Sequence, residues 1–196
     1  NVGTTRTFRH SLTTKDELGE AVADFAARCG EKLRRQQSSA AILTAYIETN
    51  DIAFRQPQYS RSFTVSFTTP TNSTLLLVKA AKFALNKIYR EGYRYKRAGV
   101  LLGGLVNHSV GEQISLFDTI DHAKHERLMA AVDTVNARYG RNAVRTAAQT
   151  IGGSARLTQQ NRLSPCYTTK WKDLLTIQVG YKSGSPSDVW EPGRGV

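Results

Sequence analysis

Hydrophobic and polar residues follow two different periods along the first 110 positions, and each period predicts one type of element. A period of two, typical of strands with one buried side, occurs over residues 5–12, 39–50, 60–69 and 93–106. In the third of these segments Phe63, Val65 and Phe67 alternate with serine and threonine without interruption. We therefore expect four strands, each with one apolar side.

Two segments between these strands show the helical period of 3.6 instead. The first covers residues 14–35 and opens with a capping-box pair, Thr14 and Glu17. The second covers residues 73–90, and Gly92 is expected to end it. The apolar stripes contain Leu18, Val22, Phe25, Cys29 and Leu33 in the first helix, and Leu77, Ala81, Ala84, Leu85 and Ile88 in the second.

The resulting order of elements, β-α-β-β-α-β, predicts an α+β domain in which two helices cover one face of a four-stranded sheet. The other face would remain open to solvent or a ligand. The second strand is expected to direct Ala41, Leu43, Ala45 and Ile47 to the covered face, and Thr44, Tyr46 and Glu48 to the open one.

The character of the chain changes after Val106. A polar linker precedes residues 121–140, which are amphipathic through Leu128, Val132 and Val135 and predict a further helix. Residues 164–175 predict a short helix capped by Thr169, and the Gly-, Pro- and Ser-rich tail predicts disorder in the absence of contacts. We divide the chain into a domain over 1–108, a linker over 109–120, a C-terminal region over 121–178 and a flexible tail over 179–196.

The charge of the chain favours a polyanionic partner. It has 27 Lys or Arg and 16 Asp or Glu, a net charge of +11, and residues 1–110 hold 16 of the basic residues but only 8 of the acidic ones. Phosphate oxygens accept hydrogen bonds from hydroxyl and guanidinium groups, so we expect nucleic acid on the open face; an ordinary solvated face is the alternative. The candidate contacts are Arg6, Arg9, Thr44, Tyr46, Arg61, Ser62, Thr64, Ser66, Arg94, Lys96 and Arg97. A stripe of Lys79, Lys82, Asn86 and Arg90 on the second helix would point away from that face, and we interpret it as solvated.

Catalysis and metal binding are not predicted for this chain. His122 and His125 lack a second pair of ligands, and the acidic residues are scattered, whereas two-metal chemistry needs clustered carboxylates. Cys29 lies in a helical core stripe, where a reduced thiol acts as a small hydrophobe, and with the lack of a signal peptide or long apolar run this favours the cytoplasm. The first residue is not Met, so we expect the C-terminal piece of a longer protein.

Residues 113–117, QISLF, place apolar side chains in the polar linker. A Gln followed three and four residues later by Leu and Phe is typical of a short docking peptide. In such a peptide the amide bonds to the rim of a pocket, and the apolar pair fills a cleft. Packing of the same side chains against the helix at 121–140 is the alternative.

Several motifs occur in an order that resembles one protein family. They are TRTF, FAARCGEKLRRQ, ILTAYIETNDIAF, YRYKRAGVLLGGL, QISLF and LSPCYTTKW, and the likeness covers roughly residues 4–178. The sequence resembles the C-terminal half of UmuC-type Y-family translesion polymerases, the catalytic subunits of DNA polymerase V, and plasmid-borne relatives of the ImpB/MucB/SamB type look similar. Arg9 departs from the family pattern, in which a glycine commonly occupies this position.

The resemblance implies a role for each part of the chain. Residues 1–108 would be the little finger, which grips damaged template-primer DNA, and Gln113, Ile114, Ser115, Leu116 and Phe117 would bind the β sliding clamp. The chain would be a non-catalytic part of an error-prone SOS polymerase. It would hold no cofactor, because Mg²⁺ is expected only in the palm, fingers and thumb, which are absent. A UmuD′-type subunit and RecA are further candidate partners, and a membrane is not.

Two other classes of function stay open. A stand-alone nucleic-acid-binding module of ferredoxin-like topology, without clamp docking, would stack bases on aromatic side chains of the open face. Only Tyr46 is clearly placed to do so, which counts against this alternative. An independent enzyme would need a polar cluster that the sequence does not supply, and a primer-extension assay would test it.

Overall fold

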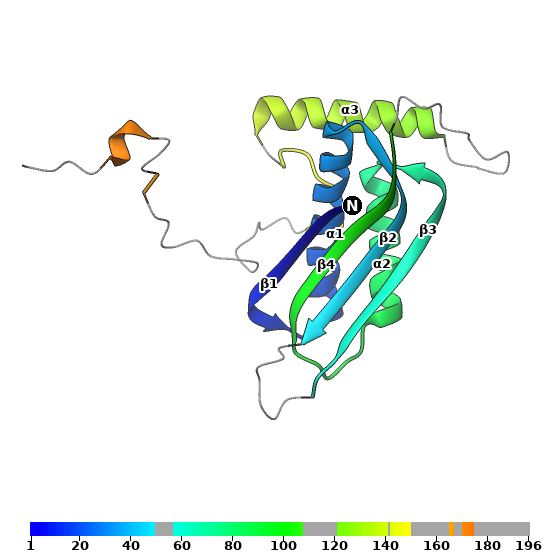
Figure 1. Ribbon diagram of the computed structural model, residues 1–196, viewed down its shortest axis with the longest axis vertical. Coiled ribbons are helices and arrows are strands. Elements are labelled where there is room, and N and C mark those ends of the chain that lie inside the picture. Colours follow the sequence, from blue (N-terminus) through cyan, green and yellow to red (C-terminus); the bar gives the residue numbers. More distant parts are fainter. Residues whose placement is uncertain (50–56, 108–120, 141, 150–164, 167–169, 175–196) are drawn as a thin grey trace, which may run out of the picture. The chain divides into compact units, whose positions relative to one another are not determined.

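The computed structural model describes residues 1–49, 57–107, 121–140, 142–149, 165–166 and 170–174. The chain divides into two compact units, residues 1–159 and 160–196. Within the described residues, the first unit contains a four-stranded sheet and three helices (Figure 1). The described part of the second unit forms one turn of 3₁₀ helix, η2 (Trp171–Asp173).

Four strands form the sheet: β1 (Val2–Leu12), β2 (Ser38–Thr49), β3 (Ser60–Thr71) and β4 (Tyr95–Asn107). They lie in the order β1-β4-β2-β3, and every neighbouring pair is antiparallel. Because β4 lies between β1 and β2, those two strands run parallel to each other, and their connection must cross over the sheet. The helix α1 (Lys15–Arg35) makes this crossover, and α2 (Thr74–Ile88) connects β3 to β4. Both helices lie on the same face of the sheet (Figure 1), so the predicted α+β architecture is confirmed.

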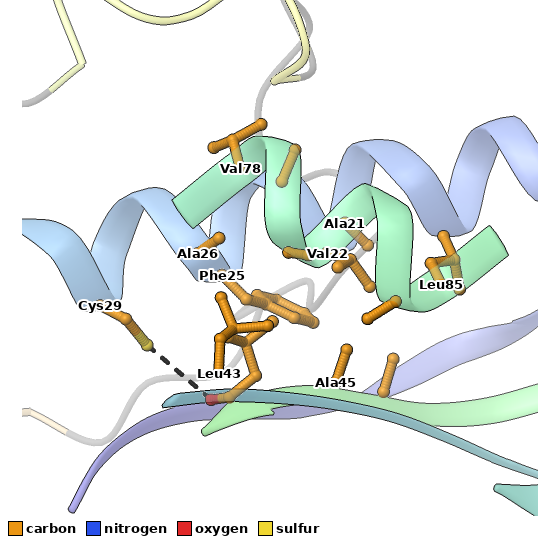
Figure 2. Close-up of a cluster of buried hydrophobic side chains, with 14 of the residues drawn as sticks. Ala21, Val22, Phe25, Ala26, Cys29, Leu43, Ala45, Val78 and Leu85 are labelled. Carbon is orange, nitrogen blue, oxygen red and sulfur yellow. Dashed lines mark hydrogen bonds between the residues drawn. The ribbon is translucent and has the colours of Figure 1, made fainter. Parts of the chain in front are cut away.

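The hydrophobic core lies between the two helices and the face that they cover. Phe25 and Cys29 of α1, Leu85 of α2 and Leu43 of β2 are buried there, in the space between helices and sheet that Figure 2 shows. Burial of each large apolar side chain contributes about 1.5–3 kcal/mol. All residues of the two predicted apolar stripes are buried, so the helical period identified the core-facing sides correctly.

The predicted ends of the two helices had different outcomes. The cap at the start of α1 is present, because Thr14 Oγ1 accepts the Glu17 N–H at 3.3 Å and donates to the Glu17 carboxylate at 2.9 Å. The second helix ends at Ile88, earlier than predicted, because Tyr89 adopts an extended backbone with φ −64° and ψ 135°. Gly92 does not end the helix; with φ +88° it belongs to the turn that follows.

One position of β2 departs from the predicted alternation. Ala40 is fully buried, whereas Ala41, expected on the core side with Leu43, is only half-buried. The register between β2 and β3 shifts between Ala40 and Ile42, which interrupts the alternation of sides. The other predicted core positions of β2 are buried as expected.

A third helix, α3 (His122–Tyr139), belongs to the same unit as the sheet and is held by polar contacts. The Arg34 guanidinium of α1 donates to both carboxylate oxygens of Asp133, at 2.6 and 2.8 Å. His125 Nδ1 lies 2.8 Å from the hydroxyl of the serine that precedes α2. The buried apolar residue of α3 is Met129, whereas Leu128, expected on the core side, is 44% exposed. His125, Met129 and Asp133 are spaced four residues apart and so share the docked side, which the apolar pattern alone did not identify.

Two predictions concern segments beyond residue 140. The turn η2 is preceded by Lys170 at its cap position, which makes no side-chain capping bond. Thr169 and the predicted flexible tail, residues 179–196, lie outside the described residues. Among the described helices, none has the length and apolar character needed to span a membrane.

Candidate nucleic-acid interface

The sheet face opposite the helices, which we call the open face, carries mainly hydroxyl groups. Directly paired residues of antiparallel strands share a face, so the strand register assigns each side chain. The register places Thr5 and Thr7 of β1, Arg97, Gly99 and Leu101 of β4, Ile42, Thr44, Tyr46 and Glu48 of β2, and Ser60, Ser62, Thr64 and Ser66 of β3 on the open face. The exposed Arg9 and Thr68 lie where the register shifts.

Arg97 lies at the charged end of the open face and links three strands. Its Nη1 is 3.5 Å from a carboxylate oxygen of Glu48 on β2, and its Nε is 3.5 Å from Thr7 Oγ1 on β1. The Arg97 and Glu48 side chains are 53% and 31% exposed, so this solvated ion pair contributes at most about 1 kcal/mol. A guanidinium held by such long contacts can reorient toward a phosphate, with which it forms stronger charge-assisted hydrogen bonds.

The β2–β3 side of the open face is a row of hydroxyl groups. The Oγ1 atoms of Thr44 and Thr64 lie 2.8 Å apart and share one hydrogen bond. Ser62 and Ser66 flank Thr64 on β3, and all three are exposed. Neutral hydroxyls of this kind donate to phosphate oxygens and carry no information on base sequence.

Glycines opposite the largest side chains keep the open face flat. Tyr46 pairs with Gly99, and a Cβ added at Gly99 would lie only 2.5 Å from the Tyr46 ring, so the ring lies on the glycine. Leu101 covers Gly3 in the same manner, again with 2.5 Å to an added Cβ. Such pairs hold an aromatic or aliphatic side chain along the sheet. Tyr46 is therefore packed on the strand and does not stand out from it.

Two of the predicted contacts, Arg6 and Arg61, lie on the other side of the sheet. Arg6 pairs with Ala98 and Arg61 pairs with Ile47, and both partners are fully buried on the helix-covered face. The two arginines therefore lie at the sheet edges on the helix side. Their predicted placement beside the open face was wrong.

The remaining predicted cations gather near the charged end of the open face. Lys96 lies where the register of β4 shifts, and its Nζ donates to the Arg9 carbonyl at 2.9 Å. Arg9 and Arg94 are exposed, the latter immediately before β4. With Arg97 these side chains concentrate positive charge at one end of the sheet. Whether the predicted residues contact DNA stays a prediction.

Two residues that shape this face were not among the contacts predicted from the sequence. Gly99 supports the Tyr46 ring, and an isolated glycine within a strand pattern is a usable sign of such a close approach. Thr7 accepts from Arg97, but its place beside that side chain follows only from the strand register. The clamp motif, Gln113 to Phe117, lies outside the described residues.

Cys29 is a core residue and takes no part in the open face. It is a free, buried thiol whose Sγ donates to Thr4 Oγ1 at 3.3 Å. Burial raises the pKa of the Cys29 thiol, against smaller opposite effects of the Thr4 hydrogen bond and the Lys32 charge. The thiol is therefore protonated and unreactive at neutral pH, as its place in the predicted helical stripe indicated.

The fold and the open face together define a basic α+β domain with one uncovered sheet face. Residues 1–116, more than half of the chain, match the impB/mucB/samB family C-terminal domain. The chain therefore belongs to the impB/mucB/samB family. Residues 126–177 match a second family, a domain of unknown function.

Curated relatives bear out this membership. The chain is 34% identical over 174 residues to protein UmuC and 36% identical over 178 residues to protein ImpB, both of Salmonella typhimurium. It is 35% identical over 170 residues to protein MucB of Escherichia coli. These matches cover 88%, 89% and 86% of this chain but 41%, 41% and 39% of the relatives, so the chain spans about two fifths of their length. The resemblance to UmuC-type proteins is confirmed.

Some solved structures show a partial likeness. An insertion ternary complex of Dbh DNA polymerase matches with a TM-score of 0.45 and 14% identity, over 54% of this chain and 28% of that one. The little finger domain of PolIV, in a complex with the beta-clamp processivity factor, matches with a TM-score of 0.39 and 15% identity, over 60% of this chain and 98% of that one.

Proposed function

We propose that this chain is the DNA-gripping and clamp-docking part of a translesion DNA polymerase. In this proposal the open face holds duplex template-primer DNA by its backbone, and residues 113–117 tether the enzyme to a sliding clamp. The tether would raise the local concentration of polymerase at the primer end. Membership of the impB/mucB/samB family supports the origin in a polymerase.

The observation that carries the proposal is the chemistry of the open face. Arg9, Lys96 and Arg97 supply charge at one end, and serine and threonine hydroxyls cover the β3 side. A surface with these groups binds phosphates in a sequence-tolerant way, as an enzyme that copies damaged templates requires.

The scarcity of aromatic side chains favours this function over a stand-alone module that stacks bases. Such a module stacks successive bases on several aromatic rings. Among the described strands, the register places one aromatic side chain, Tyr46, on the open face. The open face is therefore better suited to the regular backbone of a duplex.

Duplex binding is tested with two arginine substitutions that remove the same charge. Arg97→Gln lies on the open face and Arg61→Gln on the helix side, so we expect only the first to weaken binding of a blunt duplex. Loss of one phosphate contact lowers the slope of log K against log salt by about 0.9. Fluorescence anisotropy over a salt series measures both quantities. Equal effects of the two substitutions would contradict a binding site on the open face.

Clamp docking is tested with the double substitution Leu116→Ala/Phe117→Ala. We expect the unaltered chain to bind the clamp at micromolar strength with little dependence on salt, since the contact is apolar. The double variant should lose this binding and keep its thermal unfolding midpoint. Binding that is equal in both proteins and abolished by salt would exclude the motif as the contact. Contacts with a UmuD′-type subunit or RecA, and a cytoplasmic location, stay predictions.

A further inference from the structure

Residues 57–90 form a continuous segment of one charge sign, and its charged side chains lie on the helix side of the domain. The segment contains five Lys or Arg residues and no Asp or Glu. It includes β3 and α2, and α2 lies on the face opposite the open face (Figure 1). We call its cationic exterior the α2 surface; its members are Arg61, Lys79, Lys82, Lys87 and Arg90, all exposed.

The α2 surface differs in charge from α1. A solvated helix usually mixes acidic and basic side chains, whereas the α2 surface has only basic ones. Two of the cations of α1 have acidic partners one turn away: Arg28 pairs with Asp24 at 2.8 Å, and Arg35 pairs with Glu31 at 2.9 Å. Such pairs, one turn apart, balance the charge of a helix surface. Among the ion pairs of the described residues, none includes a cation of the α2 surface. Within residues 57–90 no acidic side chain offsets the charge of these cations.

Aromatic rings lie among these cations. Phe83, in the middle of the exposed side of α2, is 49% exposed, and the Lys87 ammonium lies 5.4 Å from its ring centroid. The ring of Phe63 on β3 packs against the Phe83 ring at a steep angle, with centroids 6.1 Å apart. A half-exposed phenylalanine at this place offers apolar ring surface to a planar ligand once the Lys87 ammonium turns toward a phosphate.

A second group of cations lies where α2 ends. Arg61 and Arg90 both lie over the ring of Tyr59, at 6.0 and 5.4 Å from its centroid. The Tyr59 hydroxyl donates to the Ile88 carbonyl at the end of α2, at 2.6 Å, and so fixes the ring there. Arg61, which does not belong to the open face, thus contributes to the α2 surface.

We propose that the α2 surface binds single-stranded nucleic acid, with Phe83 stacking on a base and the cations contacting phosphates. Cations arranged along a path with an exposed aromatic ring among them are the two features that single strands require, and base stacking tolerates any sequence. An acidic protein would match the charge equally well but would have no use for an exposed ring. Because the sheet separates this surface from the open face, duplex and single strand occupy the domain together. The inference therefore goes beyond the proposed function and can fail without it.

The test compares three variants of the full 196-residue chain for binding of a labelled oligo-dT of about 15 nucleotides. Lys79→Gln/Lys87→Gln removes two cations of the α2 surface, and Lys15→Gln/Lys124→Gln removes two exposed cations elsewhere. Phe83→Leu keeps an apolar side chain and removes the stacking ring. We expect the first variant to bind about tenfold more weakly and to lower the salt slope by about 1.4, which corresponds to two contacts with a single strand. We expect Phe83→Leu to bind about tenfold more weakly with an unchanged salt slope.

Duplex binding, measured in parallel, separates this proposal from the function of the open face. The α2-surface variants should bind blunt duplex like the unaltered chain, and saturating duplex should not displace oligo-dT. Equal losses in the two double variants would mean that only overall charge matters and would overturn the proposal. Displacement by duplex would reduce the two sites to one, and binding of poly-glutamate in preference to oligo-dT would assign the surface to an acidic protein. Either result would also overturn it.

Discussion

Replacement of Gly99 by alanine alters the open face at a single point whose consequences can be worked out from distances. The added Cβ would lie 2.5, 2.7 and 2.8 Å from three atoms of Tyr46, whereas ordinary contacts begin near 3.4 Å. The ring must therefore move away from the sheet by about 1 Å or more. The core lies on the other side of the strand and is not disturbed. The free energy of unfolding should therefore fall only by the contribution of one cross-strand pair, about 0.5–1 kcal/mol.

The larger effect is expected on duplex binding. A raised Tyr46 ring would hold a phosphate backbone away from its neighbours on the open face, Thr44 and Arg97. Loss of two hydrogen bonds of about 1 kcal/mol each raises the dissociation constant about 30-fold. Fluorescence anisotropy with a blunt duplex measures this, and urea unfolding checks that Gly99→Ala remains folded.

A double-mutant cycle tests whether the effect acts through Tyr46. In a Tyr46→Ala background there is no ring to displace, so Gly99→Ala should have almost no further effect on duplex binding. If Gly99→Ala weakens binding by the same factor in both backgrounds, the ring is not the cause, and the account of a flat face held by Gly99 is refuted.

Four further predictions concern charge, core packing and stability. Glu48→Gln removes the acidic side chain beside Arg97 and should tighten duplex binding by a fewfold at low salt. Salt at 0.5 M should abolish this effect, because it screens the repulsion between the carboxylate and the phosphates. Weaker binding would mean that the carboxylate orients Arg97 for the phosphate. Burial raises the pKa of Cys29, so the folded chain holds that proton more tightly than the unfolded chain, and the free energy of unfolding should fall as pH rises above about 8.5. At pH 8 a thiol reagent should label the exposed Cys166 at once and Cys29 only at the rate of opening; immediate labelling of both would contradict the packing of the core. Arg34→Gln should lower the free energy of unfolding in urea by about 2 kcal/mol, because it leaves Asp133 and the start of α2 without their donor; an unchanged midpoint would mean that α3 is not held by this contact.

The elements that the sequence predicted well are those in which one period continues without interruption. The strands of the sheet and the buried sides of α1 and α2 follow from alternation and from the 3.6 period, because these patterns express which side chains leave water. The Thr14 cap was predictable for a local reason, since the partner atoms lie within one helical turn.

Some of the predictions that failed depended on contacts between distant parts of the chain. Others grouped residues by charge and ignored the side of the strand on which alternation places them. Alternation alone places Arg61 on the side of Phe63 and Arg6 on the side of Phe8; their charge led us to group both with the open face. The docked side of α3 could not be predicted from its apolar residues, because Arg34 and Asp133 are 99 positions apart and fix that side by an ion pair. The candidate site was thus predictable as a face but not residue by residue.

Photo-crosslinking shows which surface of the domain lies against duplex DNA. p-Benzoylphenylalanine would replace Ser62 on the open face in one protein and Phe83 on α2 in another, and each would be irradiated with a blunt duplex. The account predicts crosslinked duplex from position 62 and none from position 83. Crosslinks only from position 83, or equal yields from both, would contradict the claim that the open face of the sheet holds duplex DNA.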